Sequence, residues 1–286
     1  MHAYRNLYLH GRTIVPALAF AALLAACATS PTGRNQLMLI SPEAAIVESK
    51  KAYLSTVGEL DANDKLLDDP LVADRVATIT GRLVTEAIKA YPQSRDWEWS
   101  VALIDDPETV NAWAMAGGRM AVYTGLFEEL KLTDAEFAHI MAHEIAHALA
   151  NHTAERMSRA IATNLGIAVV GAASETPEIT TGATLAAKVA LELPNSRTAE
   201  SEADEIGIEL ATRAGFDPDA AVSLWKKMAS LGGSRAPEFL STHPAPEDRQ
   251  AALAKLADAV REQNPQGRLS EVQPVKIIQD NAQFER

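Results

Sequence analysis

The chain has a single cysteine, Cys27, among its 286 residues. No disulfide can therefore form within it, even in an oxidising compartment. The fold has to rest on its hydrophobic core instead. The 260 residues that follow position 26 are enough to build one large domain around such a core.

Positive charge is in short supply. The sequence has 26 basic and 38 acidic residues, and the first 26 residues contain two of the arginines and no acid. The remainder therefore has 24 basic residues against 38 acidic ones, a formal net charge of −14. This imbalance argues against a nucleic-acid partner and against binding to anionic lipid through charge.

No apolar run is long enough to span a membrane. The three most apolar segments cover residues 14–26, 160–173 and 182–193, and each falls short of the roughly 20 residues that a spanning helix needs. The second and third are rich in small residues. We expect them to be buried core helices rather than surfaces in contact with a membrane.

The first 26 residues have the features of a signal peptide, with basic residues ahead of a short apolar stretch. That stretch ends in Leu24-Ala25-Ala26-Cys27, which resembles the lipobox of bacterial lipoproteins. Cleavage would leave Cys27 at the N-terminus, acylated on its sulfur and its amine. Ala28 follows, where Asp would resemble an inner-membrane retention signal, so we expect an anchor in the inner face of the outer membrane. The alternative is a plain secretory signal that happens to precede a cysteine.

The most informative stretch is His143-Glu144-Ile145-Ala146-His147. It lies in a segment predicted to be a helix, Thr133 to about Asn151, which opens with a capping box of Thr133 and Glu136. Four residues of α-helix turn through about 400° and rise roughly 6 Å. Both imidazoles therefore project from one face and can bind a single Zn²⁺, with Glu144 placed as a general base. The alternative is a polar helix face with two solvated histidines.

A zinc hydrolase needs a third protein ligand, and the nearby histidines are poor candidates. His139 and His147 are about 12 Å apart along the helix axis, too far to share one ion. Ala150 and Thr153 stand where the metzincin motif has Gly and His, and His152 is one residue out of that register.

A better candidate lies on a second predicted helix, Ser196 to Ala214, which Gly215 ends. Glu200 and Asp204 are four residues apart on it and share a face. Glu200 can ligate zinc, and Asp204 can accept the outer N–H of a ligating histidine. Glu202 is rotated by about 200° from Glu200, and we interpret it as a solvated surface acid.

Three motifs together resemble metallopeptidase family forty-eight, which includes HtpX, OMA-type, BepA and LoiP proteases. They are H-E-I-A-H, E-x-x-A-D starting 53 residues after His147, and T-H-P near the C-terminus. The resemblance covers roughly Leu71 to Leu256. It implies a gluzincin, an α+β fold that is mainly α with a small β-sheet whose edge strand pairs with substrate. It also implies one Zn²⁺ per chain and the following roles: His143, His147 and Glu200 as ligands, Glu144 as base and Asp204 as the carboxylate behind a ligand.

The resemblance extends to the segment ahead of the zinc motif. Asn111, Ala112 and Trp113 match the family's substrate-binding stretch, before a turn at Gly117-Gly118. Residues 119–123 then alternate like a strand, and the resemblance implies that this is the edge strand that pairs with the extended substrate backbone. Pairing with substrate through main-chain bonds would give broad specificity, because side chains contribute little to it. An ordinary hairpin is the alternative.

The last motif contains Thr242-His243-Pro244. In BepA-like members a histidine here lies on a loop over the zinc, so His243 is either an inhibitory fourth ligand or a stabiliser of the transition state. Arg249, six residues later, would lie near the site and assist catalysis. Gly232-Gly233 upstream would let the loop move. A purely structural histidine ahead of a proline is the alternative.

The expected organisation is a signal peptide over 1–26, a lipidated N-terminus and tether over 27–41, a peptidase domain over 42–262 and a polar tail over 263–286. Besides the two helices above, the pattern predicts helices starting at Ser41-Pro42, Asp69-Pro70, Asp217-Pro218 and Pro246, and a strand from Trp97 to Ile104.

The sequence therefore predicts a periplasmic, lipid-anchored zinc endopeptidase that cleaves misfolded or misassembled envelope proteins. One alternative is a latent protease that acts mainly as a chaperone-like assembly factor, with His243 blocking the zinc. Another is a structural zinc site in a binding lipoprotein, but such a site has no use for a base at Glu144. The sequence leaves the oligomeric state and the bonds cleaved open.

Overall fold

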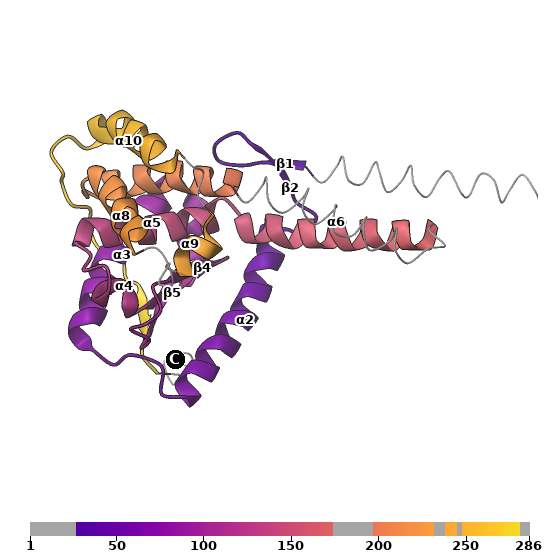
Figure 1. Ribbon diagram of the computed structural model, residues 1–286, viewed down its shortest axis with the longest axis horizontal. Helices are drawn as coiled ribbons and strands as arrows, with labels where there is room; N and C mark the ends of the chain where they lie inside the picture. Colours follow the sequence, from indigo (N-terminus) through magenta and orange to yellow (C-terminus); the bar gives the residue numbers. More distant parts are fainter. Residues whose placement is uncertain (1–26, 174–196, 232–237, 245–247, 281–286) are drawn as a thin grey trace, which may run out of the picture.

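The computed structural model describes residues 27–173, 197–231, 238–244 and 248–280 (Figure 1). It is mainly helical with a small sheet, which confirms the predicted fold class. The described elements are, in chain order, β1 (Cys27–Thr29), β2 (Asn35–Leu37), α2 (Pro42–Ala62), α3 (Pro70–Ala90), the 3-10 helix η1 (Pro92–Asp96), β3 (Ser100–Ile104), β4 (Ala112–Met115), β5 (Arg119–Tyr123), α4 (Gly125–Glu128), α5 (Asp134–Leu149), α6 (His152–Ala173), a helix over residues 197–213, α8 (Asp219–Ser230), α9 (Glu238–Thr242), α10 (Arg249–Val260), the 3-10 helix η2 (Arg261–Gln263) and β6 (Lys276–Ile278).

The central sheet has the strand order β4-β5-β3-β6. β4 pairs with β5 antiparallel, whereas β3 is parallel to both β5 and β6. Alternate residues of β3 face opposite sides of the sheet: Val101 and Leu103 join the core with α3 and α5, and Ala102 and Ile104 join a second core with α2. The sheet is therefore covered on both faces, and β4 lies at its edge next to α5. The prediction that residues 119–123 form the edge strand is wrong, because they form β5, which lies between β4 and β3.

The predicted helix starts are confirmed where the structure describes them. The Ser41 hydroxyl caps α2, the Asp69 carboxylate caps α3, and each helix has Pro at its first position. The predicted capping box of Thr133 and Glu136 is present at the start of α5. Glu136 also accepts a hydrogen bond from Lys227 of α8 at 2.7 Å, so the cap joins α5 to a neighbouring helix.

The 197–213 helix packs so closely on α5 that a side chain would not fit between them at Gly207. A Cβ on Gly207 would lie 3.0 Å from the backbone nitrogen of His143. The helix ends at Gly215, whose φ of +99° is a conformation that favours glycine. This close approach holds the acidic residues of the helix against the histidines of α5.

The predicted tether differs from what the structure contains. Residues 27–37 form a hairpin, in which β1 pairs with β2 antiparallel. Gln36 is buried, and its amide donates to the carbonyl of Ala150 at 2.8 Å. The Pro, Thr and Gly residues that suggested a tether form the turn of the hairpin, where Gly33 has a φ of +89°.

The predicted polar tail also departs from the structure. β6, inside the 263–286 segment, pairs with β3 parallel, and Ile278 is fully buried. Gly81 of α3 leaves room for this segment, because a Cβ there would lie 2.4 Å from the carbonyl oxygen of Gln273. The sequence did not predict this strand because three residues are too few to show the alternation of a strand.

The small-residue segment 160–173 is part of α6, which starts earlier at His152 and projects away from the body of the molecule (Figure 1). Ala160 and Ile161 are exposed, so the prediction of a buried core helix is wrong there. Within the described residues, no helix has the length and apolar character needed to cross a membrane. The segments 1–26 and 182–193, Gly232-Gly233 and Pro246 lie outside the described residues.

Two helical glycines give a matched test of the helix contact. Gly207→Ala should lower the free energy of unfolding by about 1–3 kcal/mol, because the added methyl group meets the backbone of α5. Gly58→Ala in α2, where a Cβ would meet nothing within 4 Å, should raise it by about 0.5–1 kcal/mol. Urea unfolding of both variants measures the difference. A Gly207→Ala protein as stable as Gly58→Ala would contradict this account of the contact.

Candidate metal centre

Four side chains from three segments converge at one point. His143 and His147 come from α5, Glu200 from the 197–213 helix, and His243 from the residue after α9. All four residues are buried, and one ligand atom of each lies within 4.8 Å of the other three. The shortest distance joins Nε2 of His143 to Nε2 of His147, at 3.0 Å.

Glu200 faces all three imidazoles. Its carboxylate oxygens lie 3.2 Å from Nε2 of His143, 3.3 Å from Nε2 of His147 and 3.2 Å from Nδ1 of His243. Burial alone would raise the pKa of this carboxyl, but the hydrogen bonds from the histidines outweigh it and hold the pKa well below its usual range. Glu200 is therefore an ionised carboxylate in a buried position.

The groups around His143 indicate which of its nitrogens faces the cluster. The carboxylate of Asp204 lies 3.0 Å from Nδ1 of His143 and also accepts a hydrogen bond from Arg249. His143 therefore carries its proton on Nδ1 and turns the lone pair of Nε2 towards His147 and Glu200. Lone pairs and a carboxylate at these distances repel one another unless a positive charge lies between them.

Without a metal ion, a second proton on His143 supplies the positive charge instead. Burial opposes a charge on the ring, but hydrogen bonds to Asp204 and Glu200 outweigh burial and raise the pKa of His143 to about 9. The cluster thus attracts either a proton or a metal ion. Two or three imidazole nitrogens with one carboxylate oxygen are a donor set that suits Zn²⁺.

Glu144 lies beside the cluster without a strong partner. Its Oε1 is buried with no hydrogen-bond partner among the described residues, although it is 3.3 Å from Nε2 of His243. Burial raises the pKa of this carboxyl. The backbone N–H of Ala114, in β4, donates to it, which places the carboxylate between the metal ligands and the edge strand.

Arg249 lies on the outer side of the ligands. Its Nη2 donates to Asp204 at 2.6 Å, its Nη1 is 3.5 Å from Glu200, and its guanidinium lies 3.6 Å above the ring of Trp225. Nε and Nη1 have no hydrogen-bond partner in the described part of the chain. The arginine thus balances part of the negative charge of the two carboxylates.

His243 is delivered to the cluster by α9. Its ring stacks on Phe239 at a centroid distance of 4.3 Å, and the backbone N–H of Phe239 donates to the carbonyl of Val110 at 3.2 Å. This bond ties α9 to Val110, two residues ahead of β4. The position of His243 is therefore coupled to the edge strand.

The residues predicted to bind substrate lie at the start of β4. Asn111 and Ala112 are buried, and the ring of Trp113 packs edge-on against Tyr53 of α2 at 5.8 Å. Their side chains thus face the body of the protein. Among the described residues no strand pairs with the outer edge of β4, so backbone groups are what this edge can offer to another chain.

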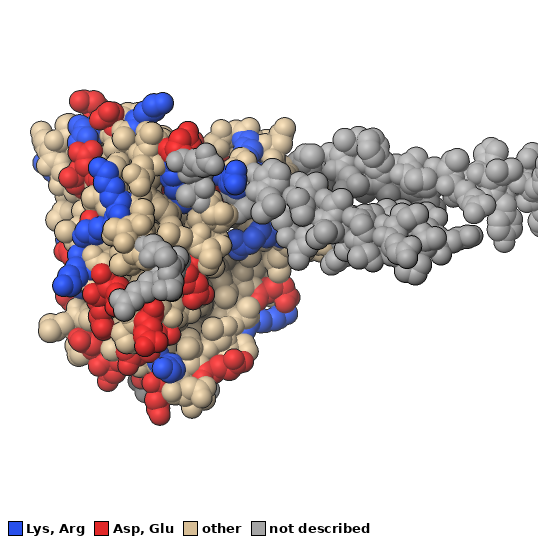
Figure 2. All heavy atoms as spheres, viewed as in Figure 1, with Lys and Arg blue, Asp and Glu red and all other residues tan. Residues whose placement is uncertain are grey.

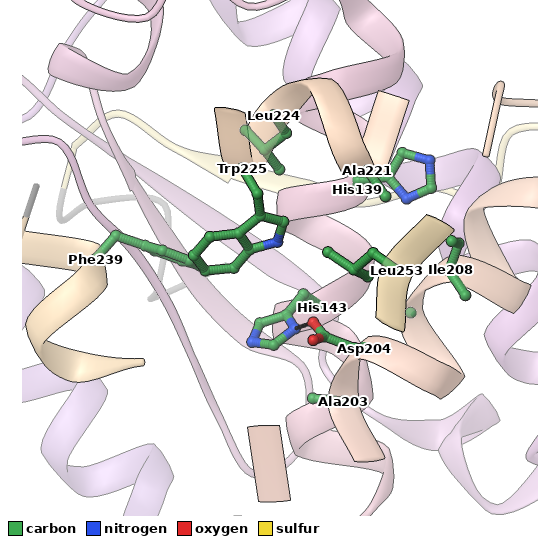
Figure 3. A pocket seen from close by; sticks show the side chains of 11 residues that line it. His139, His143, Ala203, Asp204, Ile208, Ala221, Leu224, Trp225, Phe239 and Leu253 are labelled. Carbon is green, nitrogen blue, oxygen red and sulfur yellow. Dashed lines mark ion pairs between the residues drawn. The ribbon is translucent and has the colours of Figure 1, made fainter. Parts of the chain in front are cut away.

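His139 stays outside the cluster. It is buried, its Nε2 lies 2.9 Å from the carbonyl oxygen of Asp217, and burial lowers its pKa to about 4. It lines a cavity of about 20 Å³ behind His143, with Trp225 and Leu253 on the other walls (Figure 3). That volume holds about one water molecule, so the cavity is too small for a peptide.

The interpretation of Glu202 as a solvated surface acid is wrong. Glu202 is 3% exposed, and its carboxylate binds His152, Thr32 and Arg34. The 197–213 helix is buried on this side too, because the N-terminal hairpin and α6 cover it. His152 in turn lies 2.7 Å from His147, between the Nδ1 atoms of the two rings.

Sequence reasoning missed His152 as a functional candidate because its spacing of five residues from His147 matches no ligand pattern. Glu155, three residues later, repeats the arrangement by pairing with Arg34 at 2.7 Å. The sequence offered one signal for this pairing: the predicted tether contains an arginine, Arg34, and the helix of Glu202 is rich in acidic residues.

Comparison with known proteins gives a consistent family. Residues 70–257 match the model of "Peptidase family M48". Mitochondrial metalloendopeptidase OMA1 of Arabidopsis thaliana is 36% identical over 157 residues, which is 55% of this chain and 31% of the relative. Metalloendopeptidase OMA1 of Bos taurus is 30% identical over 238 residues, 79% of this chain and 45% of the relative.

A bacterial relative gives a similar match. The beta-barrel assembly-enhancing protease of Escherichia coli (strain K12) is 31% identical over 215 residues, 72% of this chain and 43% of the relative. The chain spans less than half the length of each of these three relatives.

Proposed function

We propose that this chain, which belongs to peptidase family M48, is a zinc-dependent endopeptidase of the cell envelope. The observation that carries the proposal is the buried cluster of His143, His147 and Glu200 with the free carboxylate oxygen of Glu144 beside it. A structural metal site would not need a buried base next to its ligands.

The ligands in this proposal are His143, His147 and Glu200, and the bound Zn²⁺ would lower the pKa of water towards 7 and polarise the scissile carbonyl. Glu144 takes a proton from the attacking water and later gives it to the leaving amine. The raised pKa of the Glu144 carboxyl suits both steps, because a base with a pKa nearer neutrality can also act as an acid. Arg249 stabilises negative charge that develops near Glu200.

The substrate class follows from the edge of β4. An extended segment that pairs with this edge places its backbone beside Glu144, which the N–H of Ala114 already ties to the strand. Recognition through Asn111, Ala112 and Trp113 is by main-chain bonds, so it requires a chain that is locally unfolded. We therefore infer that the substrates are misfolded or misassembled envelope proteins, and the name of the Escherichia coli relative supports this setting.

The proposed location is the periplasmic face of the outer membrane, with acyl chains on Cys27 as the anchor. The net charge supports an anchor of lipid rather than charge, because the chain from residue 27 on has 24 basic residues against 38 acidic ones. Acidic side chains gather in the lower part of the face seen in Figure 2, and basic ones lie among the other residues of that face. The same net charge argues against nucleic acid as a partner.

A second candidate function is a latent protease that acts mainly as a chaperone-like assembly factor. The position of His243 favours it: Nδ1 lies 3.4 Å from Nε2 of His143, within the ligand cluster, and Nε2 faces Glu144. In this state the imidazole of His243 would fill the fourth coordination position of the metal and would also contact the base, Glu144. Substrate would then have to displace His243, which requires α9 to move.

The test of the base is Glu144→Gln. Zinc content should stay at one ion per chain, because the ligands are intact, while cleavage of unfolded casein should slow by about 10²–10⁴-fold. Glu200→Gln is the contrasting variant and should lose zinc. Metal analysis and casein degradation, with and without a chelator, measure both effects. Activity within twofold of wild type in Glu144→Gln would exclude it as the base.

The test of latency is His243→Ala. If His243 is an inhibitory ligand, removal of the imidazole should raise basal cleavage of casein, and the double variant with Glu144→Gln should be inactive. If His243 instead stabilises the transition state, turnover should fall by roughly 10²–10³-fold. We expect the increase. Slower cleavage than wild type at equal zinc content would rule out the inhibitory role.

The anchor is tested by Cys27→Ser. The substitution removes the sulfur that carries the acyl chain, so the protein should move from the membrane fraction to the soluble periplasmic fraction, with its peptidase activity unchanged. Fractionation of cells followed by a carbonate wash measures this. A Cys27→Ser protein that still sediments with membranes would show that something other than lipid holds it.

A further inference from the structure

A chain of side chains connects the N-terminal hairpin to the ligand His147. Nδ1 of His147 lies 2.7 Å from Nδ1 of His152, and Nε2 of His152 lies 3.0 Å from Oε2 of Glu202. Arg34 donates to the same Oε2 through Nε at 3.0 Å and Nη2 at 2.8 Å. His152 and Glu202 are both buried.

Charged groups of both signs line this chain. Arg34 pairs with Glu155 as well as with Glu202, and Arg159 pairs with Glu155 at 2.6 Å. Among the described residues, two guanidinium groups therefore face two carboxylates. The carboxylate of Glu202 accepts hydrogen bonds from the guanidinium of Arg34, the hydroxyl of Thr32 and the ring of His152.

This arrangement indicates how the two imidazoles are oriented. A carboxylate accepts hydrogen bonds, so the nitrogen of His152 that faces Glu202, Nε2, is the donor. With that proton on Nε2, Nδ1 of His152 can accept a hydrogen bond from Nδ1–H of His147. His147 is left with a lone pair on Nε2, which is the atom that faces Glu200 and His143.

We propose that His152, Glu202 and Arg34 are positioning residues that hold His147 in its ligating tautomer and ring orientation, which makes the N-terminal hairpin a part of the metal centre. The inference rests on the proposed zinc site. It gives the two histidines of the zinc motif separate supports from one helix: Asp204 acts on His143 directly, and Glu202 acts on His147 through one imidazole. Arg34 lies outside residues 70–257, the part of the chain that matches the family.

The decisive comparison is His152→Gln with His152→Leu, two side chains of similar size. A glutamine can accept from His147 through its oxygen and donate to Glu202 through its nitrogen, whereas leucine can do neither. Zinc affinity, measured by chelator competition on the metal-free full chain, should fall by about 10–100-fold in the leucine variant and be largely restored in the glutamine variant. The Co²⁺ absorption spectrum should change in the same order.

Two matched controls separate positioning from loss of a buried group. His139→Leu removes an equally buried imidazole from α5 that is not bonded to a ligand, and zinc affinity should stay within about threefold of wild type. Glu155→Gln and Glu202→Gln each remove a carboxylate bound to Arg34, but only the second touches His152. Zinc affinity should fall by about tenfold or more for Glu202→Gln alone.

Equal zinc affinity in the leucine and glutamine variants of His152 would overturn the inference, as would equal losses for Glu155→Gln and Glu202→Gln. If the leucine variant does not fold, as judged by circular dichroism, the pair of glutamate variants decides. Failure of the proposed function gives a different result, because the wild-type chain itself would then bind no zinc.

Discussion

The close contact between α5 and the 197–213 helix is the constraint on which the rest of the site depends. Gly207 lets the two backbones approach at the level of His143. At that distance two carboxylates that are four residues apart on one helix can contact the two nitrogens of a single imidazole on the other helix. Glu200 and Asp204 do this to His143 from opposite sides. Arg249 offsets part of the cost of burying these charges, and a metal ion bound by the cluster would offset more of it.

Much of this site could be predicted from the sequence because helical geometry is periodic. The spacing of His143 and His147 and that of Glu200 and Asp204 each define one face of one helix, and the capping box and the proline-led starts define where helices begin. These predictions needed no knowledge of which segments meet in space.

Predictions that depended on such knowledge were the ones that were wrong. A helical wheel assigns Glu202 to the side opposite Glu200, which would be solvent on a surface helix, but the hairpin and α6 cover that side. The hairpin itself was interpreted as a tether because strands of three residues are too short to show alternation. Ala160 and Ile161 show the opposite case: an apolar composition suggested burial, but α6 leaves the body of the protein there (Figure 1).

The parallel pairing of β3 with β6 has a consequence for how the protein matures. Ser100 and Lys276 are partners in the register and are 176 positions apart in the chain. β3 lies inside the sheet, so its second edge stays open until residues near 278 have been synthesised and have folded. Such distant pairing is slow to form. Until then the chain has an unpaired strand edge of the kind that binds extended polypeptides, and the final strand removes it by completing the sheet.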